Sequence, residues 1–148
     1  MSKSKVYFSS KITKEEVVNL YKVLGKELKG NVAIKVHSGE PGNQNFLRPD
    51  FWSDIIELVG GTIVECNTAY EGRRNTTKAH LETFKEHGWI AYPIDLLDAE
   101  GPDLVLDIPN GKVIKKNYVG KDLANYDSML VLSHFKGHPM GGYGGALK

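Results

Sequence analysis

Residues 31–37 read Asn-Val-Ala-Ile-Lys-Val-His, and nearly every position from Val32 to Val36 is apolar. A strand with one face in water alternates apolar and polar side chains, whereas a strand covered on both faces is apolar almost throughout. The run therefore predicts a central strand of a mostly parallel sheet. The Gly/Pro/Asn-rich stretch 38–49 that follows it predicts a loop.

Helical and strand-like segments alternate on either side of this run. A capping box at 13–16 predicts a helix over 14–29 that ends at Gly30. A second helix is expected from Pro49 to Gly60, and a third from a cap at Asn75 or Thr76 to Gly88. Strands are expected at 6–8, 62–66, 90–94, 104–108 and 128–133, with a hairpin turn at 110–111.

This alternation is typical of an α/β fold. We expect a single domain over residues 1–148, built as a three-layer α/β sandwich with a mostly parallel sheet and helices on both faces. Residues 31–36, 62–66 and 129–132 are expected to be neighbours in the interior of one sheet.

The composition excludes several classes of protein. Nineteen Lys and Arg residues stand against eighteen Asp and Glu, a net charge of +1 that gives no general attraction to nucleic acid or an anionic membrane. No stretch resembles a signal peptide or a membrane span, so a cytoplasmic location is expected. With one cysteine, Cys66, the chain can build neither an internal disulfide nor a cysteine-ligated cluster.

Three loops that follow predicted strands carry most of the polar residues of interest: 37–43, 67–74 and 133–145. In open α/β sheets, ligands bind beyond the carboxyl ends of the strands. We therefore expect one shared site, with His37, Asn67, Arg73 and His134 in a single cleft. Taken singly, each loop could equally be an ordinary surface connection.

The candidate ligand-binding residues share polar, cationic or glycine chemistry suited to a small carboxylate or phosphate. They are His37, Glu40, Asn43, Asn67, Tyr70, Arg73, Arg74, Lys136, Gly141, Gly142, Gly144 and Gly145.

The histidines suggest a metal ion as an alternative ligand. His134 and His138 are four residues apart, and together with His37 they could bind Zn, Ni or Fe from a loop. A pair hydrogen-bonded to backbone is the competing interpretation. His80 and His87 are expected to be structural, and Cys66 is expected to be a buried thiol.

The blocks 33–43, 67–74 and 133–148 resemble the domain-of-unknown-function 362 family over nearly the whole chain. Members of that family are described as uncharacterised iron–sulfur centre proteins, commonly with ferredoxin-type cysteine motifs further along. The resemblance implies an N-terminal part of a longer chain, with four-iron four-sulfur clusters only in the C-terminal part and none held here. It also implies an electron-transfer partner or domain.

A second likeness is local. His138, the run Gly142-Tyr143-Gly144-Gly145 and Lys148 are similar to a motif of the nickel-pincer lactate racemases, in which a His serves catalysis and a Lys ten residues later carries the cofactor. Gly144 replaces the motif's Ser and Leu147 its Arg. By this likeness His138 and Lys148 are the candidate catalytic residues. The alternative for Lys148 is a solvated lysine in the first turn of a helix.

Two functions fit these features. One is a redox or cofactor enzyme whose α/β part holds a small anionic ligand or a metal. The other is a non-catalytic module that binds a small ligand or metal, or docks a partner. Neither needs nucleic acid or a membrane.

Overall fold

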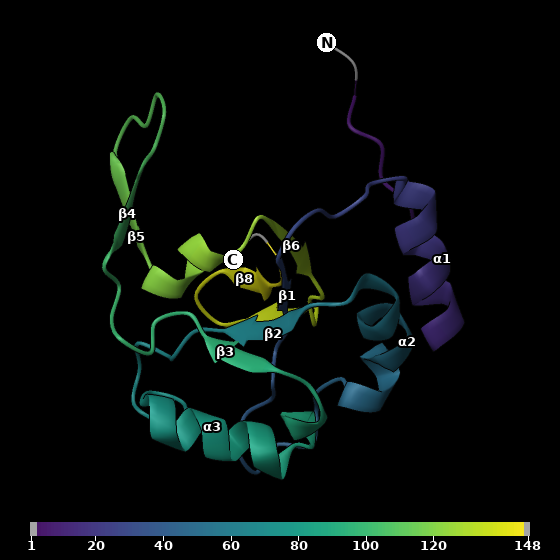
Figure 1. Cartoon of the computed structure of the whole chain (residues 1–148), viewed down its shortest axis with the longest axis horizontal. Coiled ribbons are helices and arrows are strands. Elements are labelled where there is room, and N and C mark those ends of the chain that lie inside the picture. Colours follow the sequence, from purple (N-terminus) through teal and green to yellow (C-terminus); the bar gives the residue numbers. More distant parts are fainter. Residues whose placement is uncertain (1–2, 147–148) are drawn as a thin grey trace.

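The computed structural model describes residues 3–146 and has an α/β fold (Figure 1). Four parallel strands form the main sheet in the order β3-β2-β1-β6, with β1 at Val32–Lys35, β2 at Thr62–Glu65, β3 at Ile94–Leu96 and β6 at Ser128–Val131. Ile34 of β1 lies opposite Ile63 of β2 and Leu130 of β6. The expected sheet is therefore confirmed, although β6 is its edge strand among the described residues.

The pleat of β1 separates two cores. Val32, Ile34 and Val36 point to one face and belong to the larger core, which also contains Trp52 and Phe84. Three α-helices contribute to this side: α1 (Lys14–Leu24), α2 (Pro49–Val59) and α3 (Thr77–Glu86).

The opposite face carries a smaller core. Ala33, Val64 and Leu97 pack there against Leu123 and Tyr126. These last two residues come from the 3₁₀ helix η2 (Lys121–Asn125) and its C-cap. Helices thus contact both faces, but the second face is covered by this short 3₁₀ turn and not by an α-helix.

Two small antiparallel hairpins complete the fold. Strands β4 (Leu104–Asp107) and β5 (Lys116–Val119) pair around the expected turn at 110–111, where Asn110 takes a left-handed conformation with φ 58°. This hairpin projects from the body of the domain (Figure 1). Strands β7 (Lys136–His138) and β8 (Gly142–Gly144) form the other, beside the end of β6.

Three sequence-based boundaries were wrong, each for a local reason. Helix α1 ends at Gly25 and not at Gly30, because Gly25 adopts φ 59° and its N–H caps the Lys22 carbonyl. Residues 6–8 form no strand, and the side chains of Val6 and Phe8 are exposed. Residues 89–91 form the 3₁₀ helix η1 (Trp89–Ala91) before β3 begins at Ile94, because Trp89 turns into the core.

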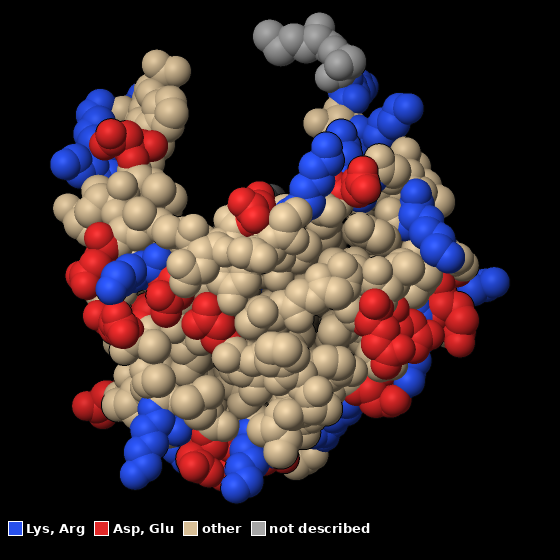
Figure 2. Space-filling model, in the orientation of Figure 1, with Lys and Arg blue, Asp and Glu red and all other residues tan. Residues whose placement is uncertain are grey.

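The charged side chains seen on one face of the molecule do not separate by sign (Figure 2). Figure 2 shows basic and acidic side chains intermixed around the rim of one face, with a largely uncharged centre. Within residues 3–146, no helix combines the length and apolar character that crossing a membrane requires.

Candidate functional site

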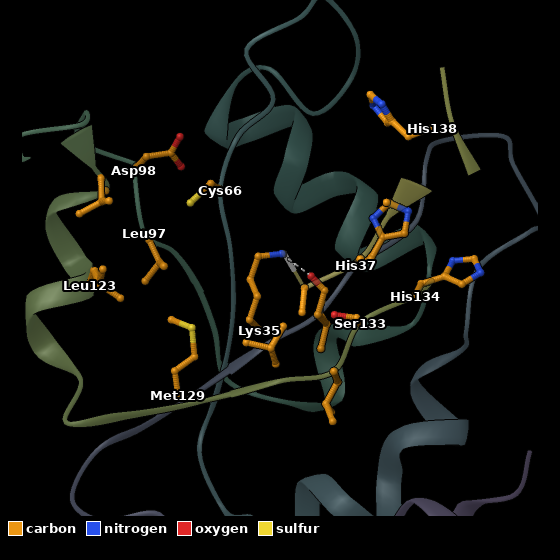
Figure 3. A pocket seen from close by; sticks show the side chains of 18 of the residues that line it. Lys35, His37, Cys66, Leu97, Asp98, Leu123, Met129, Ser133, His134 and His138 are labelled. Atoms are coloured by element: carbon orange, nitrogen blue, oxygen red, sulfur yellow. Dashed lines mark hydrogen bonds between the residues drawn. The ribbon is translucent and has the colours of Figure 1, made fainter. Parts of the chain in front are cut away.

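The carboxyl ends of all four parallel strands border one pocket of about 550 Å³. Because the strands run in the same direction, the residues that follow them emerge at one edge of the sheet. Val36 and His37 follow β1, Cys66 follows β2, Leu97 and Asp98 follow β3, and Ser133 and His134 follow β6. Hairpin β7–β8 and the segment around η2 close the remaining sides (Figure 3).

Two histidines and a lysine form the polar wall of the pocket. The rings of His37 and His134 stack with centroids 6.0 Å apart. The ammonium group of half-buried Lys35 donates to the Val36 carbonyl at 2.6 Å. The Nδ1 atom of His134 is buried, and it neither donates nor accepts a hydrogen bond among the described residues. A buried polar nitrogen of this kind costs free energy unless a further group satisfies it.

Beneath this wall lies Glu65, a carboxylate that is only 4% exposed. Its oxygens lie 3.0 Å from His80 Nε2, 3.2 Å from Arg74 Nη1 and 3.7 Å from His37 Nδ1. Burial alone would raise the pKa of Glu65, but His37, His80 and the charge of Lys35 outweigh it and hold the pKa well below its usual range. Glu65 is therefore an ionised carboxylate that faces the Nδ1 edge of the His37 ring at 3.7 Å, and Nε2 lies on the other edge.

Arg74 joins Glu65 to the surface. Its guanidinium donates to Glu65, through two nitrogens to Glu40, and to the Tyr70 hydroxyl at 3.3 Å. Partial burial of Glu40 opposes its ionisation, but the hydrogen bond and charge of Arg74 lower the pKa of that carboxyl. Because two carboxylates already occupy Arg74, this residue works as a structural bridge in the present geometry.

The loop after β1 is held from below by the core. The Ser38 carbonyl accepts hydrogen bonds from Trp89 Nε1 at 3.3 Å and from His87 Nδ1 at 2.8 Å. Gly39 has φ 98°, and a Cβ there would come within 2.7 Å of the Phe46 ring. The loop therefore needs glycine at this position, and its anchoring fixes the place of His37.

The structure divides the predicted site residues into two groups. Those that line the pocket are His37, His134, Lys136, His138, Gly144 and Gly145. Those that lie outside its lining are Glu40, Asn43, Asn67, Tyr70, Arg73, Arg74, Gly141 and Gly142. Lys148 lies outside the described residues.

The expected single cleft thus brings His37 and His134 together but leaves out Asn67 and Arg73. The Asn67 backbone N–H donates to both oxygens of Asp98, and its side chain contacts Thr77 and His80. Arg73 turns outward and pairs with Glu86 on α3. Both residues follow β2, but this position did not determine where their side chains point, because each side chain pairs with another residue of the protein.

The geometry bears on the proposed metal and cofactor residues. No group of three or more His, Cys, Asp or Glu side chains in the described part of the chain is arranged to hold a metal ion. His138 Nδ1 accepts from the backbone N–H groups of Met140 and Gly141, at 3.2 and 3.1 Å. A cubane iron–sulfur cluster needs about four thiolates, so the single cysteine does not fit one.

Sequence reasoning missed Lys35 and Glu65 as site residues. Each is a charged residue inside an otherwise apolar strand, a pattern that is itself a signal because such residues are rarely buried without partners. Cys66 was expected to be buried but is exposed at the pocket. Partial desolvation of its sulfur and the charge of Asp98 raise the pKa of Cys66 to about 11, so the thiol is protonated at neutral pH.

His134 offers the first testable prediction. Desolvation, Lys136 and His37 together lower the pKa of His134 below its ordinary value of 6.5. The folded protein therefore binds this proton less tightly than the unfolded chain, and protonation costs stability as the pH falls through the unfolded value. An NMR titration of the ring protons, assigned with a His134→Gln variant, should show His134 titrating below 6.5. Titration of His134 at or above pH 6.5 would contradict the desolvated surroundings described for its ring.

Comparison with known proteins adds the family. No curated protein and no solved structure matches the chain. The family model described as "Domain of unknown function (DUF362)" matches residues 32–148, from the first strand of the sheet through hairpin β7–β8. Because this match spans far more than half of the sequence, the chain belongs to the DUF362 family.

Proposed function

We propose that this domain binds a small anionic ligand at the carboxyl ends of its parallel strands, as the ligand-holding part of a redox or cofactor enzyme. The observation that carries the proposal is the convergence of all four strand ends on one pocket whose polar wall is Lys35, His37 and His134. An ammonium group and imidazole N–H groups are suitable donors for a carboxylate or phosphate.

The charges around the pocket support an anion over a cation. Asp98 is the one carboxylate among the described lining residues, and both of its oxygens accept the Asn67 N–H. Glu65 lies behind His37, where one of its oxygens is 3.2 Å from Arg74 and 3.9 Å from the Lys35 ammonium nitrogen. The described lining residues therefore carry two lysines, Lys35 and Lys136, against one carboxylate, Asp98.

The ionised Glu65 behind His37 favours an enzyme over a passive binding module. A buried carboxylate that orients an imidazole is a common support for proton transfer in active sites. A binding protein has less need of such a buried charge, which is costly to desolvate. The redox part of the proposal rests on the family resemblance alone.

Replacing Lys35 by methionine tests the proposal. We expect acetate and inorganic phosphate, added separately, to shift the NMR signals of His37 and His134 in the wild-type protein. Losing one charge-assisted hydrogen bond of about 1.5 kcal/mol should weaken that binding about tenfold in Lys35→Met.

The matched control is Lys85→Met, which removes an exposed lysine from the last turn of α3, outside the pocket lining. Its affinity for both anions should equal that of the wild type. If neither anion perturbs the pocket, or if both variants lose affinity equally, the proposed site is wrong.

A further inference from the structure

The pocket has an apolar end opposite its histidine-lined polar end. Leu97, Leu123 and Met129 border the cavity on the side away from the histidines, with Lys35 between the two groups (Figure 3). Leu97 and Leu123 belong to the smaller hydrophobic core, so they are held firmly in place. A ligand that reaches from Lys35 toward Met129 therefore meets an apolar surface.

Part of this apolar surface is open to solvent. Met129 is 39% exposed and Val131 is 43% exposed, although both lie on the sheet face that borders the pocket. Tyr118 of β5, at the rim, is 64% exposed. Covering apolar surface stabilises a complex by roughly 25 cal/mol per Å². The exposed side chains thus offer binding energy that a bare inorganic anion cannot use.

The size of the pocket points the same way. A volume of about 550 Å³ falls in the range of sites that enclose an organic ligand, about 300–1,000 Å³. Such sites are mostly apolar, with a few polar groups that fix the orientation of the ligand. His37 and His134 at one end, with Lys35 beside them toward the middle, provide these polar groups (Figure 3).

We infer that the ligand is an amphipathic organic anion. Its carboxylate or phosphate lies against Lys35, His37 and His134, and an apolar body lies against Leu97, Leu123 and Met129. The inference rests on the proposed function, since it assigns the ligand class of that same pocket. It excludes inorganic anions and short, fully polar acids as the preferred ligands.

Four probes separate the two ends of the ligand: acetate, inorganic phosphate, phenylacetate and the uncharged phenylacetamide. Burying a benzyl group should contribute about 1.5–3 kcal/mol, so phenylacetate should bind about 10–100 times more tightly than acetate. Phenylacetamide should bind at least tenfold more weakly than phenylacetate, because it lacks the charge. Dissociation constants come from NMR titration, followed at the Met129 methyl group and at His134.

Met129→Gln should remove most of the preference for phenylacetate over acetate. The control is Leu81→Gln, a change at a comparably exposed apolar residue on α3 that lies outside the pocket lining. It should keep the preference intact.

The outcomes distinguish the two proposals. Equal affinity for acetate and phenylacetate, or unchanged preference in Met129→Gln, would overturn the amphipathic ligand and leave the anion site standing. Equal affinity for phenylacetate and phenylacetamide would also overturn it, since no anionic group would then be recognised. Failure of every anion to bind would overturn the proposed function itself.

Discussion

Replacing Glu65 by glutamine is expected to destabilise the domain by about 3–5 kcal/mol, the usual cost of removing one partner from a buried ion pair. The neutral amide would remove the buried counter-charge of Arg74, which would keep only the more exposed Glu40, and would alter the contact with His80. Because a domain of this size is stable by only about 5–15 kcal/mol, such a loss would bring the variant close to unfolding. Urea denaturation followed by circular dichroism measures the change.

Two other glutamates serve as graded controls, one outside the Glu65 network and one at its outer end. Glu86→Gln breaks the Arg73 ion pair, whose two side chains are both about half exposed, and no measurable loss is expected. Glu40→Gln removes the outer partner of Arg74 and should cost less than Glu65→Gln, because that carboxylate is 41% exposed. Equal effects at all three glutamates would show that burial of Glu65 does not matter.

The loss of stability expected for Glu65→Gln also depends on pH. The folded-state pKa lies below the unfolded value of 4.5, so the carboxylate stabilises the fold above that pH. This contribution is lost as the pH falls from 4.5 toward the lower folded value. The stability difference between the wild type and Glu65→Gln should therefore be constant near neutral pH and shrink in acid. A difference that grows in acid would mean that Glu65 is protonated in the folded protein.

Trp89→Ala is the second large effect, with an expected loss of about 3–5 kcal/mol. The indole is fully buried against Phe84 and fills the core below the strand ends. Its Nε1–H also donates to the Ser38 carbonyl, so the variant should loosen the loop that carries His37. NMR should therefore show changed signals for His37 as well as a lower urea midpoint.

Ile90→Ala is the matched control, because it lies in the same 3₁₀ helix but is 61% exposed. Its stability should stay within about 0.5 kcal/mol of the wild type. A Trp89→Phe variant keeps an aromatic ring but loses the N–H donor and part of the buried volume, so its cost should lie between those of Ile90→Ala and Trp89→Ala. If Ile90→Ala were as damaging as Trp89→Ala, the assigned orientation of this turn would be wrong.

Much of the fold follows from local pattern. The apolar runs at Val32–Lys35 and Thr62–Glu65 predicted buried strands. The starts of α1, α2 and α3 were predicted from the capping box at 13–16, from Pro49, and from a cap at Asn75 or Thr76, of which the structure uses Thr76. These signals are reliable because each is satisfied within a few residues of the chain. The end of helix α1 at Gly25 and the 3₁₀ turn at Trp89 were harder to predict, since several nearby glycines and apolar residues fit more than one boundary.

The site was predictable only in part. The rule that ligands bind at strand ends correctly placed His37 and His134 at one pocket. It could not foresee that Arg73 pairs with Glu86 or that Arg74 is shared by Glu40 and Glu65. The direction of a long side chain depends on partners far away in sequence, and no local pattern encodes them.

The sequence by itself determined the α/β class, the parallel sheet and the edge of that sheet where polar residues gather. It did so because continuous apolar runs, and the alternation of strands with helices along the chain, are local features of the sequence. Only the tertiary structure decided that Glu65 is a buried anion beneath His37, and that Lys35 faces a cavity with an apolar end. Burial and charge pairing arise when Arg74, His80 and the strand ends meet in space, and they set the pKa of Glu65 and the chemistry of the pocket.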